Sequence, residues 1–142
     1  MNKGISRFNI RVYALIIFKN NILLSRELIQ NKLIYKFPGG GVEIGEGIVD
    51  ALQREAKEEM GQHLNHITHF YTTDFFQRSS FDSSEQLISV YFKASLSQHL
   101  NNRFKIPVKD QPVFEWKTLV DLNEEDLHFP IDKKVLNMIK LQ

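Results

Sequence analysis

The chain has 142 residues, of which 42% are hydrophobic and 11% aromatic, enough for one core and for a single domain over residues 1–142. Its 18 basic and 17 acidic residues leave a net charge of +1, so the basic excess of a protein that binds long nucleic acids is missing. The lack of cysteine excludes disulfides and thiolate zinc sites.

The first seven residues lack the apolar stretch of a signal peptide, and the longest apolar run, residues 12–18, is too short to span a bilayer. A reducing compartment suits a chain without cysteine. We therefore expect a cytoplasmic protein that does not enter a membrane.

The first elements in chain order are strands. Residues 9–18 are rich in β-branched and aromatic side chains, and they predict a strand that begins half-exposed and ends buried on both faces. A turn at residues 19–21 returns the chain into a second strand at 22–25, which predicts a hairpin. The short apolar segment 33–37 then leads into a glycine run.

The run Pro38-Gly39-Gly40-Gly41 favours neither helix nor strand, and predicts a sharp bend or a close approach by another group. Residues 47–61 then predict a helix that ends at Gly61, a residue suited to a left-handed C-terminal position. Apolar residues recur every four positions along this helix. They are Ile48, Leu52 and Ala56.

The remaining chain predicts strands at residues 67–76, 86–96 and 112–119, with a polar loop at 77–85. Residues 123–126 open a short turn or helix, and Asp132 is a candidate cap for a final helix that continues to 141. The order of these elements predicts an α/β (α+β) fold with helices packed against a mixed sheet.

The predicted helix places carboxylates on the face that should dock on the core. At about 100° per residue, Glu55 and Glu59 lie within about 20° of the direction of Ile48. Two such charges about 6 Å apart repel by about 3 kcal/mol at an effective dielectric near 20. A divalent cation would remove this cost, and the carbonyl of Gly39 or Gly40 is suited to join its ligands.

A plainer interpretation is a solvated helix on which Arg54 and Glu58 form an ion pair four residues apart. It does not explain why a glycine run, an acid at position 46 and acids on the docking face occur together. The spacing resembles the signature of the Nudix family, G-x5-E-x7-R-E-U-x-E-E-x-G-U, in which U is aliphatic. The matching residues are Gly40, Glu46, Arg54, Glu55, Glu58, Glu59 and Gly61, with Ala56 at the first U and Gln62 departing from the last.

The resemblance implies the Nudix fold, a curved mixed β-sheet sandwiched between helices, and a hydrolase that uses Mg²⁺, with Mn²⁺ as a substitute. It implies that Glu55 and Glu59 bind the main ion together with the Gly39 carbonyl. Glu58 would hold a further metal ion or its water. Arg54 would orient the helix carboxylates, and Glu46 would tie the loop to the helix.

The general base stays open at this point. It is either a glutamate of the box or a distant acid, for which Asp110, Glu115 and Glu85 are the candidates. For each of the three, a plain surface position is favoured over a catalytic role. Arg26, at the end of the second predicted strand, is a candidate contact for a substrate phosphate or a surface cation.

Residues 115–123 also resemble the C-terminal part of the MutT branch of the family, which acts on oxidised dGTP. That branch carries an asparagine at the start of its last helix to recognise the purine, whereas this chain has Asp132. The change disfavours oxidised guanine as the substrate.

The expected function is cleavage of the diphosphate bond of a nucleoside diphosphate linked to another moiety, with release of a nucleoside monophosphate. A nucleotide sugar, ADP-ribose or a nucleoside triphosphate fits this description. Two alternatives are a pyrophosphohydrolase acting on the 5′ end of RNA and a non-catalytic Nudix domain that binds a nucleotide and regulates. The oligomeric state stays open, although many relatives pair as homodimers.

Overall fold

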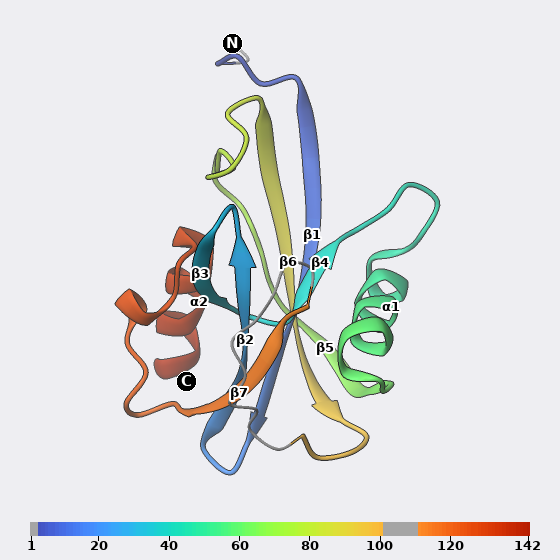
Figure 1. The fold of residues 1–142 in the computed structure, drawn as a ribbon, viewed down its shortest axis with the longest axis vertical. Coiled ribbons are helices and arrows are strands. Elements are labelled where there is room, and N and C mark those ends of the chain that lie inside the picture. The colour runs from blue at the N-terminus through green and yellow to red at the C-terminus, as the bar shows by residue number, and fades with distance from the viewer. Residues whose placement is uncertain (1–2, 101–110) are drawn as a thin grey trace.

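The computed structural model describes residues 3–100 and 111–142, which form a β-sheet with helices on both sides (Figure 1). The strands are β1 (Arg7–Phe18), β2 (Asn21–Ile29), β3 (Lys32–Lys36), β4 (Gly39–Gly41), β5 (Leu64–Thr72), β6 (Glu85–Leu96) and β7 (Val113–Thr118). The helices are α1 (Ile48–Met60), the short 3₁₀ helix η1 (Glu124–Asp126) and α2 (Pro130–Lys140).

The sheet is mixed, as the sequence predicts. Its strands follow the order β3-β2-β1-β6-β5, while β4 pairs with β1 and β7 pairs with β2. β1 and β6 run parallel, and the other pairs are antiparallel. The predicted hairpin is confirmed between β1 and β2, where Ile17 lies opposite Ile22.

The second half of β1 is buried on both faces, and this explains how one strand supports two helices. Val12, Ala14 and Ile16 pack in a core with Ala51, Leu52 and Ala56 of α1. Tyr13 and Leu15, which point to the opposite face, pack in a second core with Val135 of α2 and its neighbours. α1 and α2 therefore lie on opposite sides of the sheet (Figure 1).

The predicted helix is confirmed with a one-residue difference at each end. α1 is capped by Gly61, directly after its last residue; the φ of Gly61, 69°, is left-handed, and its N–H donates to the Lys57 carbonyl. No helix within the described residues has the length and apolar character needed to cross a membrane.

Three local predictions are wrong. The glycine run is a short strand, β4, because its edge pairs with β1, Gly40 opposite Val12. The strand predicted at residues 67–76 occupies Leu64–Thr72 instead, and two register shifts interrupt its pairing with β6. The cap of α2 is Phe129, followed by Pro130 at the first turn, because Asp132 lies inside the helix and is buried.

Candidate functional site

The glycine run passes so close to its neighbours that side chains would not fit. Gly39 has a φ of 152°, and a Cβ there would lie 2.0 Å from the Val12 carbonyl oxygen. A Cβ on Gly40 would lie 2.4 Å from Oε1 of Glu55. The predicted close approach is therefore confirmed, since β4 runs directly against a carboxylate of α1.

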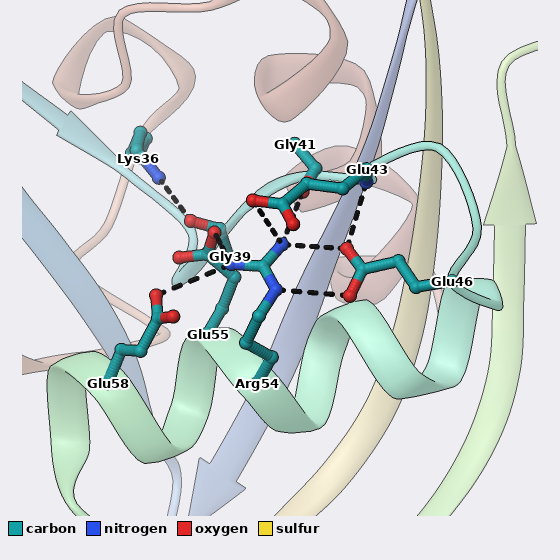
Figure 2. Close-up of polar contacts among 8 residues, drawn as sticks. All are labelled: Lys36, Gly39, Gly41, Glu43, Glu46, Arg54, Glu55 and Glu58. Atoms are coloured by element: carbon teal, nitrogen blue, oxygen red, sulfur yellow. Dashed lines mark hydrogen bonds and ion pairs between the residues drawn. The ribbon is translucent and has the colours of Figure 1, made fainter.

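Arg54 joins the loop that follows β4 to the carboxylates of α1 (Figure 2). Its guanidinium donates to both oxygens of Glu46, at 2.8 and 3.1 Å, and to the carbonyl of Gly41 at 2.9 Å. Another nitrogen, Nη1, donates to Glu55 at 3.1 Å and to Glu58 at 3.3 Å. The bidentate contact raises the pKa of Arg54 and lowers that of Glu46, so both groups stay charged.

The three carboxylates of α1 differ in exposure. The side chain of Glu55 is only 14% exposed, whereas that of Glu58 is 57% exposed. Glu59 is partly buried, and its pKa rises to about 9 because of burial and of a hydrogen bond with Glu55, against the opposing charge of Lys36. The paired charges that the sequence predicts on the docking face thus lie together at a real electrostatic cost.

Lys36 and Glu27 also lie at this site, and no motif in the sequence singles them out. Lys36 is only 2% exposed, and its Nζ donates to the Phe37 carbonyl at 3.1 Å. The same nitrogen donates to the Gly39 carbonyl at 3.4 Å (Figure 2). Oε2 of Glu27 lies 3.0 Å from the same nitrogen. Burial lowers the pKa of Lys36, but the charges of Glu27 and Tyr13 outweigh it and raise the pKa overall. The sequence signal was a lysine in the apolar segment that precedes the glycine run.

A pocket of about 260 Å³ opens beside Lys36 and Glu27. Its wall combines strand residues of β1 and β6 with Phe81 and the first turn of α2. Asp132 lines this pocket and is only 1% exposed; the Tyr91 hydroxyl donates to its Oδ1. Its Oδ2 has no partner in hydrogen-bond geometry among the described residues.

The candidate bases lie in different places. Glu85 lines the pocket, accepts hydrogen bonds from Arg7 and Asn9, and pairs with Arg7. Because Gly39 pairs with Tyr13, six positions further along β1, Glu85 is about 20 Å along the sheet from the glycine run. Asp110 lies outside the described residues.

The remaining two candidates contact each other. Nη1 of Arg26 lies 2.8 Å from Oε1 of Glu115, whose other oxygen is 3.2 Å from Lys117. Neither Arg26 nor Glu115 lines the pocket beside Lys36.

The oxygen groups beneath β4 suit a hard divalent cation. The carboxylates of Glu55 and Glu59 are adjacent and largely enclosed, and the missing Cβ of Gly40 leaves room for the first of them. Over residues 3–100 and 111–142, no three acidic, histidine or cysteine groups are already gathered in a metal-binding cluster. A bound ion would therefore need Glu58 or the Gly39 carbonyl as a further ligand beside Glu55 and Glu59.

A comparison with models of known protein families shows to which family the chain belongs. A model of the NUDIX domain matches residues 7–140. The chain belongs to the Nudix family. It is a Nudix hydrolase, and such enzymes act on pyrophosphate bonds. A search of curated proteins found no match.

Solved Nudix structures share the fold at low sequence identity. A MutT Nudix hydrolase from Burkholderia pseudomallei is 21% identical with a TM-score of 0.74, over 94% of this chain and 99% of that one. The ORF135 protein of E. coli is 19% identical with a TM-score of 0.70, over 95% and 90% of the two chains. An ADP compounds hydrolase is 18% identical with a TM-score of 0.66, over 94% and 71%. At these identities the likeness establishes the fold and not the substrate.

Proposed function

We propose that this Nudix hydrolase uses Mg²⁺ to cleave the diphosphate bond of a nucleoside diphosphate linked to another moiety, and that it releases a nucleoside monophosphate. One observation carries the proposal. The carboxylates of Glu55 and Glu59 lie near Lys36, and Lys36 and its partner Glu27 line a pocket of about 260 Å³. A ligand with an anionic end and a compact organic end fits such a site.

In this proposal Glu55, Glu59 and the Gly39 carbonyl hold the ion, with Glu58 available to a second ion or its water. Mn²⁺ can replace Mg²⁺, since all of these donors are oxygens. When bound there, the ion would neutralise diphosphate oxygens and acidify the attacking water. Arg54 keeps the carboxylates in place through its contacts with Glu46 and the Gly41 carbonyl.

A glutamate of α1 is the favoured general base. Glu115 is held by Arg26 and Lys117, and Glu85 is at the far end of the pocket. Glu58 is the most exposed acid of the helix end, so a water molecule can reach its carboxylate. The proton would pass from that water to a carboxylate oxygen of Glu58.

The substrate class we propose includes nucleotide sugars, ADP-ribose and nucleoside triphosphates. Relatives of this fold include an ADP compounds hydrolase and MutT proteins, which supports the breadth of the class. Action on RNA 5′ ends is disfavoured by the net charge of +1. A role restricted to nucleotide binding is disfavoured because every acid of the box is present.

A panel of nucleotide sugars, ADP-ribose, dinucleoside polyphosphates and nucleoside triphosphates tests the proposal. With Mg²⁺ we expect at least one compound to release a nucleoside monophosphate, and EDTA should stop the release. Mn²⁺ should restore it. A protein that turns over none of these compounds, yet binds one by calorimetry, would be a binding module instead. Turnover of triphosphorylated RNA alone would support the RNA alternative.

A further inference from the structure

The site has two halves, the carboxylates of α1 and the pocket of about 260 Å³. The ion pair of Lys36 and Glu27 lies between them. Lys36 ends β3 and is opposite Ser25 of β2, while Glu27 is two residues further along β2 on the same face. Oε2 of Glu27 accepts a hydrogen bond of 2.8 Å from the Ser25 hydroxyl and also faces Nζ of Lys36. The pair is therefore fixed by neighbouring positions of one hairpin.

Lys36 contacts both halves at once. Its ammonium group donates to the Gly39 carbonyl in the strand next to α1 (Figure 2). The same side chain lines the pocket, together with Tyr13 and Asp132. A ligand with one end in the pocket and the other at Glu55 must pass this nitrogen.

Lys36 is a cation among mostly acidic side chains. Glu27, Glu85 and Asp132 line the pocket, and Glu55 lies beside the Gly39–Gly41 strand next to it, so an anionic ligand meets mostly acidic side chains. Among the described lining residues the cations are Lys36 and Arg11. Nε of Arg11 donates to the Tyr13 hydroxyl at 2.7 Å, whereas Lys36 reaches the carbonyl beside the helix carboxylates.

We propose that the ammonium group of Lys36 binds the phosphoryl group attached to the nucleoside part of the substrate, and that Glu27 is the positioning residue that holds it there. This inference rests on the function proposed above. A charged phosphoryl oxygen is a stronger acceptor than a backbone carbonyl, so Nζ can exchange a carbonyl for phosphate while it keeps Glu27. A purely structural ion pair is the competing account, and buried pairs are often replaceable without loss of stability.

The test compares how tightly the protein binds each nucleoside and its 5′-monophosphate in EDTA, which removes any contribution from a metal ion. The probes are adenosine, guanosine, cytidine and uridine with AMP, GMP, CMP and UMP, titrated by calorimetry or NMR. For the preferred base, the wild type should bind the monophosphate about tenfold to a hundredfold more tightly than the nucleoside.

Lys36→Met should reduce this preference to within about twofold, and Lys36→Arg should keep most of it. Lys32→Met, which removes an exposed lysine from the same strand, should keep all of it. Glu27→Ala should lose the preference as Lys36→Met does, while Glu27→Gln, which retains an acceptor oxygen, should lose part of it. Nucleoside affinity should stay constant across the set, which separates this role from a structural one.

The double variant Glu27→Gln/Lys36→Met guards against misfolding, because it leaves no unpaired buried charge; it should fold and lack the preference. The inference is overturned if Lys36→Met keeps the wild-type preference, or if Arg11→Met abolishes it instead. It is also overturned if the wild type shows no preference although Mg²⁺-dependent turnover is intact. If the wild type binds neither probe and hydrolyses nothing, the proposed function fails with it.

Discussion

The carboxyl group of Asp132 is enclosed between the sheet and the first turn of α2. Burial raises its pKa from the ordinary 3.8 to about 6, although the Tyr91 hydroxyl and the charge of Lys36 act in the opposite direction. A carboxyl whose folded pKa exceeds its unfolded pKa stabilises the fold below about pH 4, and that contribution is lost as the pH rises through about 6. The difference corresponds to about 3 kcal/mol.

Asp132→Asn should therefore flatten the pH dependence of stability. Wild-type protein should lose up to about 3 kcal/mol of unfolding free energy relative to the variant between pH 4 and pH 7.5, because only the wild type must ionise a buried group. Urea unfolding at several pH values measures this. Asp121→Asn, at an exposed position, is the control and should parallel the wild type. Parallel curves for Asp132→Asn would show that the buried carboxyl does not titrate in this range.

At the scale of elements, the contact between β4 and α1 sets the position of Glu55. The register of β4 against β1 fixes Gly40 opposite Val12, and Val12 packs against α1 from the same strand. The Glu55 carboxylate occupies the space that a side chain on residue 40 would need. A short strand without side chains thus acts as a flat surface against which the helix places its carboxylates.

Gly40→Ala should impair activity more than stability. Its Cβ would lie 2.4 Å from Glu55 Oε1, the end of a flexible side chain, so the carboxylate would move while the backbone stays in place. Misplacement by about 1 Å can cost about a hundredfold in turnover. Gly41→Ala is the matched control, because the nearest atom to its Cβ would be 3.6 Å away. Thermal unfolding and Mg²⁺-dependent turnover of the two variants decide; equal turnover would contradict the idea.

The sequence predicts elements whose signal is local. The helix was predicted because apolar residues recur every four positions and Gly61 ends it. The shift from residues 67–76 to Leu64–Thr72 was not predictable, because pairing with β6 and its register shifts determine where β5 begins and ends. The strand at Gly39–Gly41 depends on partners in β1, which propensity does not reveal.

The residues of the site also divide into those with a local sequence signal and those brought together only by strand pairing. Glu55, Glu58, Glu59 and Arg54 were predicted because they occupy one helix at fixed spacing. Lys36 and Glu27 join the site only when β2 pairs with β3, so their sequence positions alone gave no sign of contact. Asp132 stands out in the sequence because the MutT branch carries an asparagine at the matching position. Its predicted capping role is wrong because α2 begins earlier, at Pro130.

At the scale of the whole molecule, the two halves of the site come from opposite sides of the sheet. α1 and α2 lie on opposite sides of the sheet (Figure 1). α1 carries the carboxylates, while Ile131 and Asp132 in the first turn of α2 line the pocket. The two halves meet where Tyr13 of β1, a pocket residue, lies opposite Gly39 of β4. We expect the carboxylates of α1 to bind the ion on which hydrolysis depends.

Turnover of the best panel compound by Glu59→Gln, with and without Mg²⁺, tests whether these carboxylates bind that ion. Glutamine resembles the protonated carboxyl that burial favours, so the variant should fold at least as stably as the metal-free wild type. Mg²⁺-dependent release of nucleoside monophosphate should fall by a factor of about a thousand or more. Glu125→Gln, at an exposed site, should retain full activity. Wild-type turnover by a folded Glu59→Gln protein would contradict the account.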